Sequence, residues 1–182
     1  MTQDLWTAVD HYISKTLLPP DHALDAAITA SDEAGLPSIQ VSAAQGKLLH
    51  ILALMQNAKR ILEIGTLGGY STIWLARALP DNGKLITIEI DPKHAAVAKA
   101  NIERAGLSNK VEIITGSAVD ELPAVADRDD GPFDLSFIDA DKANIPVYFE
   151  WALRMSRPRS IILVDNVVRE GAVIDAASTD AA

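Results

Sequence analysis

Five short apolar segments alternate with longer segments of helical periodicity between residues 60 and 165, and this alternation limits the possible folds more than any other feature of the sequence. The apolar segments have the length of buried β-strands, and their expected bounds are 60–64, 84–90, 111–115, 133–139 and 160–165. The expected helices between them are 71–79, 92–105, 117–125 and 143–156. Because strands that alternate with helices form parallel sheets covered on both faces, the sequence predicts a doubly wound α/β fold.

Three more helices are expected before the first strand. Apolar residues recur at helical spacing over residues 2–18, 21–35 and 43–57, and a Pro-Pro pair separates the first two of these segments. The length of 182 residues fits one domain with one sizeable core. We therefore expect a single domain, residues 1–182, made of a helical cap at 1–57, an α/β core at 58–170 and a mobile loop at 171–182.

The composition narrows the classes of partner. Acidic residues outnumber basic ones by 25 to 16, which gives a formal net charge of -9 and argues against a surface for nucleic acid or anionic membrane. The absence of cysteine excludes disulfides and thiolate metal sites, so a metal would need oxygen or imidazole ligands. No segment reaches the ~20 apolar residues of a membrane span, and the start of the chain lacks a secretory pattern. We expect a soluble, cytoplasmic protein with small-molecule partners.

A glycine-rich loop follows the first expected strand in the sequence ILEIGTLGGYST, residues 61–72. It contains three glycines and a serine that opens the next helix: Gly65, Gly68, Gly69 and Ser71. These residues would let the backbone turn sharply and approach a ligand closely. The spacing is G-x-x-G-G and not the G-x-G-x-x-G of dinucleotide sites. Taken alone, the loop also fits a tight turn without a ligand.

An acidic residue, Glu89, ends the next expected strand, where a carboxylate can accept hydrogen bonds from ribose hydroxyls. Taken alone, it also fits a solvated acid at a strand end. Combined with the glycine loop, it predicts a cofactor that contains a nucleoside. Because the pyrophosphate pattern is missing, S-adenosylmethionine fits better than NAD.

Oxygen-bearing side chains end two further strands. Asp139 lies in FIDADK, and Asp165 and Asn166 lie in LVDN, at the ends of strands that should be neighbours. Two carboxylates and an amide oxygen form the kind of site that binds magnesium, manganese or calcium. Either motif alone also fits a helix cap or a turn. Together, they predict a divalent metal site.

The motifs LEIGTLGGYS, ITIEID, FIDADK and VDN occur in this order, and with them the sequence resembles the cation-dependent O-methyltransferases, a family that includes catechol and caffeoyl-coenzyme A O-methyltransferases and small bacterial relatives. The resemblance extends from Pro37 to Gly171 and implies the Rossmann-like fold of class I methyltransferases with an N-terminal helical cap. The family continues beyond this sequence through another helix and an antiparallel strand pair. We therefore expect either a further C-terminal segment or a second chain that covers the last strand.

The resemblance also implies roles for individual residues. The methionine part of S-adenosylmethionine would be held by Glu63, Gly65 and Ser71, in a pocket lined by Val41 and Ser42. Glu89 would bind the ribose, and Ala118 would lie along the adenine. Asp139 would serve both the cofactor and the metal, and the expected metal ligands are Asp139, Asp165 and Asn166, for Mg²⁺, Mn²⁺ or Ca²⁺. Lys142 matches the family's proposed general base and is expected to be catalytic together with Asp139.

The expected activity is methyl transfer from S-adenosylmethionine to a hydroxyl of a small catechol-like or hydroxycinnamoyl-like phenolic acceptor, by a homodimer. In this activity Lys142 would accept the proton of the acceptor hydroxyl. A simpler interpretation of the same residue is an exposed lysine that pairs with Asp141. Two alternative functions stay open: a non-catalytic S-adenosylmethionine-binding or assembly module, and an NAD-dependent oxidoreductase. In RPRSII, Arg159 stands where members of that family usually have a turn glycine.

Overall fold

Five parallel strands form one sheet at the centre of the computed structural model, which describes residues 3–128 and 131–178. The strands are β1 (Arg60–Ile64), β2 (Lys84–Glu89), β3 (Val111–Thr115), β4 (Phe133–Ile138) and β5 (Ser156–Val164). Their order is β3-β2-β1-β4-β5, and each neighbouring pair is parallel. The chain runs outward from β1 to β3 and then returns to the other side of β1. The crevice at the carboxyl ends of β1 and β4 is therefore where such sheets bind ligands.

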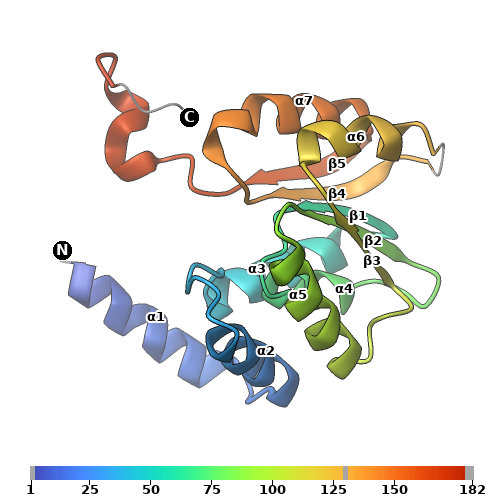
Figure 1. Cartoon of the computed structure of the whole chain (residues 1–182). Helices are drawn as coiled ribbons and strands as arrows, with labels where there is room; N and C mark the ends of the chain where they lie inside the picture. The colour runs from blue at the N-terminus through green and yellow to red at the C-terminus, as the bar shows by residue number, and fades with distance from the viewer. Residues whose placement is uncertain (1–2, 129–130, 179–182) are drawn as a thin grey trace.

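Helices cover both faces of this sheet, as the alternation predicted (Figure 1). The connecting helices are α4 (Tyr70–Ala76), α5 (Pro92–Arg104), α6 (Ala118–Ala126) and α7 (Ile145–Arg154). Before β1 come α1 (Gln3–Leu17), α2 (His22–Glu33) and α3 (Ala43–Met55), and two short 3-10 turns are η1 (Lys142–Asn144) and η2 (Arg169–Ile174). In Figure 1, α6 and α7 lie on one face, α3, α4 and α5 on the other, and α1 and α2 outside the second group. Among the described helices, none is long and apolar enough to cross a membrane.

Two apolar clusters, one on each face, hold these layers together. Ile61 of β1 belongs to the cluster with α3, α4 and α5, whereas Leu62 and Ile64 belong to the cluster with α6 and α7. Side chains alternate along a strand, so Glu63 points to the same face as Ile61, toward α4. Because both faces are covered, β4 is buried throughout and β2 is buried from Leu85 to Glu89, and this explains their continuous apolar sequences.

Every expected element is present, with differences at the ends. The sequence analysis placed the start of β5 at residue 160, because Pro158 interrupts the apolar pattern. The strand begins at Ser156 instead, and its pairing with β4 contains a register shift. Helix α4 ends at Ala76 and not at residue 79, because the amides of Ala78 and Leu79 bond to carbonyls three residues back. Residue 2 of the first expected helix and residues 179–182 of the expected mobile loop lie outside the described residues. Residues 171–174 belong to η2.

Arg159 takes up a left-handed backbone conformation, with φ at 79°. A side chain in this region costs about 1–2 kcal/mol through contact of its Cβ with the backbone. Arg159→Gly should therefore raise the free energy of unfolding by about 1 kcal/mol, less a smaller entropic loss. Urea denaturation measures this change. Arg159→Ala is the matched control, since it removes the same side chain but keeps the Cβ, and a midpoint for the glycine variant at or below that of the alanine variant would contradict the assignment of strain.

Candidate active site

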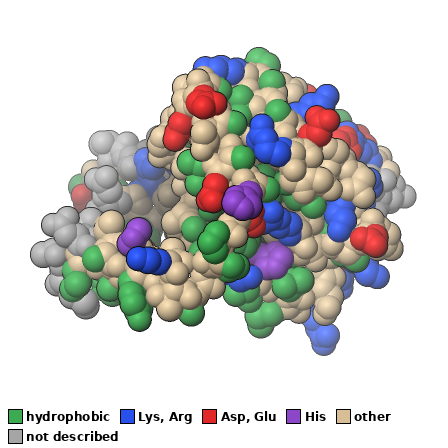
Figure 2. Space-filling view, turned by 90° about the horizontal axis from the view of Figure 1, so that it is seen from below, with side chains coloured by type: hydrophobic (Ala, Val, Ile, Leu, Met, Phe, Trp, Pro, Cys, Tyr) green, Lys and Arg blue, Asp and Glu red, His purple; other side chains and the backbone are tan. Residues whose placement is uncertain are grey.

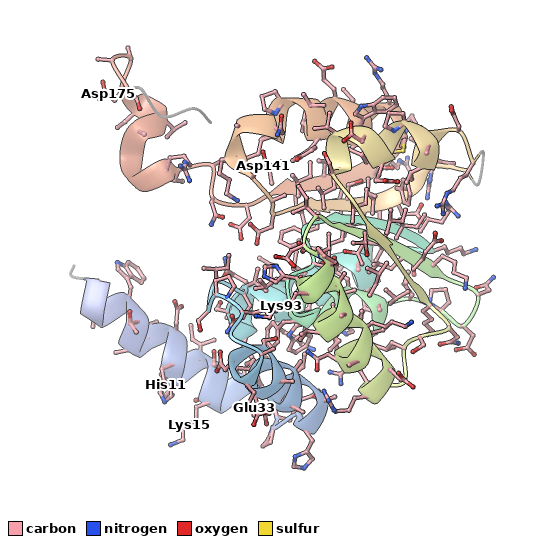
Figure 3. The ribbon with its side chains drawn as sticks, viewed as in Figure 1. His11, Lys15, Glu33, Lys93, Asp141 and Asp175 are labelled. Carbon is pink, nitrogen blue, oxygen red and sulfur yellow. The ribbon has the colours of Figure 1, made fainter. Side chains whose placement is uncertain are left out.

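A cavity of about 760 Å³ opens at the carboxyl ends of the strands. Its walls come from the loop after β1, the end of β2, the loop after β3, the turn after β4 and the segment before α3. In Figure 3, Asp141 lies above the open end of the sheet, beside α7, and Lys93 lies below it at the start of α5. The volume is in the range of cofactor and small-molecule sites.

The structure brings most of the sequence-predicted site residues to this one cavity. Those that line it are Val41, Gly65, Ser71, Glu89, Ala118, Asp139, Lys142 and Asn166. Three others lie beside it. Ser42 caps α3, where its hydroxyl accepts from the amide of Gln45 at 3.2 Å. Glu63 is fully buried behind Ser71, and Asp165 lines a smaller apolar cavity of about 140 Å³ between α3 and β5.

The glycines of the loop after β1 are needed for packing within the chain. Gly65 has φ at 94°, and a Cβ there would lie 1.9 Å from the carbonyl oxygen of Asp139. At Gly68 a Cβ would lie 2.0 Å from Oγ of Ser31 in α2. The sequence suggested that these glycines permit close approach of a ligand. The structure shows that they let the loop pack against the end of β4 and against α2, which fixes one wall of the cavity.

Glu63 orients Ser71 from beneath the cavity. Its carboxylate accepts hydrogen bonds from Oγ of Ser71 at 2.7 Å and from Oγ1 of Thr72 at 2.5 Å. Burial raises the pKa of Glu63 to about 7, although these hydrogen bonds act in the opposite direction. The residue therefore acts on the cavity through the side chain of Ser71.

Glu89 ties the glycine loop to β2. Its Oε2 accepts from the amides of Thr66 at 3.0 Å and Leu67 at 2.8 Å, and its Oε1 accepts from the amide of Asp91 at 3.0 Å. Three backbone donors thus hold the carboxylate in one orientation at the cavity wall. This is the arrangement expected of a carboxylate that positions a ligand.

Asn101 is a positioning residue that the sequence interpretation missed. It is fully buried in α5, and its Nδ2 donates to the carbonyl oxygens of Gly68 at 2.9 Å and Ala27 at 3.3 Å. It therefore links the glycine loop to α2. The available signal was an asparagine on the apolar face of a helix, where Ala98 and Ile102 are also buried.

The turn after β4 is held by hydrogen bonds to Asp141. Tyr148 donates to its Oδ1, and Nδ2 of Asn144 donates to its Oδ2 at 2.6 Å. Burial raises the pKa of Tyr148, and the hydrogen bond to Asp141 raises it further. The sequence analysis gave neither Tyr148 nor Asn144 a role, although both line the cavity. Lys142 pairs with Asp139, with Nζ 3.0 Å from Oδ1, and not with Asp141 as the simpler interpretation supposed.

The expected metal ligands lie at two adjacent strand ends. Ile138 of β4 is in register with Val164 of β5, so Asp139 and Asp165 occupy the next pair of positions. Asn166 has φ at 58°, a left-handed conformation that asparagine adopts more readily than most other non-glycine residues. Oδ1 of Asp165 accepts from the backbone and side-chain nitrogens of Asn166 at 2.7 and 3.3 Å.

These donors fit a hard divalent cation. They supply two carboxylates and one amide oxygen, which are the ligand types that magnesium, manganese and calcium prefer. The described residues contain no group of three or more acidic, histidine or cysteine side chains that could hold a metal. A set of three protein ligands at this position would therefore need the amide oxygen of Asn166.

Comparison with known proteins identifies the family. The family model described as O-methyltransferase matches residues 21–182. The chain belongs to the O-methyltransferase family. Among relatives of this O-methyltransferase, a catechol O-methyltransferase from Niastella koreensis is 57% identical over 182 residues, which cover 100% of this chain and 82% of that protein. A catechol O-methyltransferase from Mycobacterium tuberculosis is 53% identical over 173 residues, which cover 95% of this chain and 77% of that protein.

Solved O-methyltransferases share the fold and have the cofactor bound. The O-methyltransferase from Bacillus cereus in complex with SAH superposes with a TM-score of 0.95 at 53% identity, covering 98% of this chain and 81% of that one. TomG from Streptomyces achromogenes in complex with SAM gives a TM-score of 0.95 at 50% identity, covering 100% and 81%. The protein is therefore an S-adenosylmethionine-dependent O-methyltransferase with the expected Rossmann-like fold. This result sets aside the NAD-dependent oxidoreductase and the non-catalytic module.

Proposed function

We propose that this O-methyltransferase methylates one hydroxyl of a small catechol-like or hydroxycinnamoyl-like phenol in a reaction that depends on a divalent cation. The single observation that carries the proposal is the group at the ends of β4 and β5, where Lys142 and Asp139 form a pair beside Asp165 and Asn166. The names of the two catechol O-methyltransferases above support the same class of acceptor.

The proposed cofactor contacts follow the walls of the cavity. Gly65, Ser71 and Val41 would contact the methionine part, Ala118 the adenine and Glu89 the ribose. Asp139 would contribute to both the cofactor and the metal. Glu63 and Ser42 would act from outside the cavity wall, since one orients Ser71 and the other begins α3 next to Val41.

The proposed metal ligands are Asp139, Asp165 and Asn166. When bound, the cation would polarise the acceptor oxygens. Lys142 would take the proton of the acceptor hydroxyl at Nζ, which its contact with Asp139 holds at the end of β4. The half-buried position of Lys142 limits the access of water to this proton transfer.

A homodimer is the proposed assembly. Among the described residues of α1, six large apolar side chains are exposed: Leu5, Trp6, Val9, Tyr12, Ile13 and Leu17. Figure 2, which views the molecule from below the view of Figure 1, shows hydrophobic side chains among charged ones at the surface. A surface with several large apolar side chains favours contact with a second chain.

A panel of acceptors tests the proposed function. The full chain is incubated with S-adenosylmethionine labelled on the methyl group, magnesium and matched sets of catechols, flavonoids and hydroxycinnamoyl thioesters, and labelled products are identified by mass. We expect methylation of compounds with two neighbouring hydroxyls and far slower methylation of their monohydroxy analogues. Equal rates with both kinds of compound would refute the proposed acceptor class.

Glu89→Ala should weaken the binding of S-adenosylmethionine by about 1–3 kcal/mol, because ribose hydroxyls and backbone amides would lose a buried acceptor. Calorimetric titration measures the change. Glu103→Ala, at an exposed position of α5, is the control and should bind the cofactor with normal affinity. Glu89→Gln keeps one acceptor oxygen and should lie between the alanine variant and the unaltered protein. If both Glu89 variants bind S-adenosylmethionine with the affinity of the unaltered protein, Glu89 does not contact the ribose.

A further inference from the structure

Glu89 has too few free acceptor positions for a whole ribose. A carboxylate offers about four lone-pair positions. The amides of Thr66 and Leu67 use Oε2, and the amide of Asp91 uses one position on Oε1. One position on Oε1 is therefore left, while the ribose of S-adenosylmethionine carries two hydroxyls. The second hydroxyl needs another partner in the cavity wall.

His94 lies where that partner is needed. It belongs to the first turn of α5, is half-buried and lines the same cavity as Glu89. Its Nδ1 lies 3.6 Å from Oε1 of Glu89, and its Nε2 lies 3.9 Å from Oδ2 of Asp91. Both separations exceed the length of a hydrogen bond. When one ribose hydroxyl donates to Oε1, the hydroxyl on the neighbouring carbon lies close enough to form a hydrogen bond with the ring of His94.

We propose that His94 is a second ribose-binding residue, which forms a hydrogen bond with the hydroxyl that Glu89 does not fully satisfy. The inference rests on the proposed assignment of Glu89 to the ribose. A neutral imidazole has one donor and one acceptor nitrogen, so it can pair with a hydroxyl in either direction. The contact would recognise the sugar of the cofactor and would leave the adenine and the methionine part unaffected.

Calorimetric titration with three ligands tests this contact. The ligands are S-adenosylhomocysteine and its 2′-deoxy and 3′-deoxy analogues, and the proteins are the unaltered full chain, His94→Ala and Lys93→Ala. Lys93 is the matched control, since it is the exposed neighbour of His94 and does not line the cavity. A lost hydrogen bond should weaken the binding of S-adenosylhomocysteine to His94→Ala about tenfold. The deoxy analogue that lacks the contacted hydroxyl should bind to His94→Ala less than about twofold more weakly than to the unaltered protein.

His94→Phe separates hydrogen bonding from packing, because it keeps an aromatic ring without polar atoms. We expect it to behave like the alanine variant, and circular dichroism with thermal melting verifies that both variants are folded. Normal affinity in His94→Phe, or equal weakening with all three ligands, would overturn the proposal. The titration needs neither metal nor acceptor, so a failure of metal-dependent methylation does not affect its outcome. A wrong assignment of Glu89 is detected separately, as normal affinity in Glu89→Ala.

Discussion

Replacing Asp165 with alanine should lower the rate of methyl transfer by at least about a hundredfold, while the fold and the cofactor affinity stay close to normal. This loss would exceed the roughly 10–100-fold loss that is typical when a residue that only supports a metal ligand is replaced. Asp165 lies outside the cofactor cavity, and the hydrogen bonds to its side chain come from the neighbouring Asn166. Its removal therefore disturbs little of the fold. It does remove one of the two carboxylates of the proposed metal site.

The measurements for this variant separate loss of metal from loss of fold. Turnover at saturating S-adenosylmethionine, calorimetric cofactor affinity and thermal melting are compared between Asp165→Ala and the unaltered protein. Asp175→Ala is the control, because that aspartate is exposed and lies near the C-terminal end, away from Asp141 (Figure 3). We expect the control to be fully active. Normal turnover by Asp165→Ala would contradict its role as a metal ligand.

Lys142→Ala should lower turnover by about 10²–10⁴-fold, the range for loss of a general base, with cofactor affinity nearly unchanged. The structure places Nζ of Lys142 3.0 Å from Oδ1 of Asp139, at the end of β4. Single-turnover rates at saturating cofactor measure the chemical step separately from binding.

Lys142→Arg distinguishes proton transfer from charge. The guanidinium keeps the positive charge next to Asp139 but does not release its proton at accessible pH. If Lys142 acts as a base, the arginine variant should be about as slow as the alanine variant. Restored turnover in the arginine variant would instead show that Lys142 contributes only its charge. A loss confined to cofactor binding would show a structural role.

The sheet and the strand-end positions of residues such as Glu89 and Asp139 followed from periodic features of the sequence, whereas Val41, Ser42 and Ala118 were named only through the family resemblance. Buried parallel strands require continuous apolar segments, and their carboxyl ends require ligand-facing side chains at the next positions, as at Glu89 and Asp139. The start of β5 did not follow in the same way. Pro158 cannot donate to a strand ladder, and an irregular pairing with β4 accommodates it, which only the folded chain defines.

Contacts between distant segments could not be predicted from local patterns. The sequence predicted that Gly65 permits close approach of a ligand, and the structure adds a constraint from the carbonyl of Asp139, directly after β4. Asn101 bonds to residues of two other segments of the chain, and neither partner is marked in the sequence. Tyr148 follows Asp141 by seven residues, and a 3-10 turn between them brings the two side chains together.

The central claim is that methylation of a vicinal dihydroxy phenol requires a divalent cation at the ends of β4 and β5. The most direct measurement is transfer of a labelled methyl group from S-adenosylmethionine to a catechol by the full chain, before and after excess chelator, and again after magnesium or manganese is added back. We predict that chelation abolishes product formation and that either metal restores it. Full turnover in excess chelator would contradict the claim.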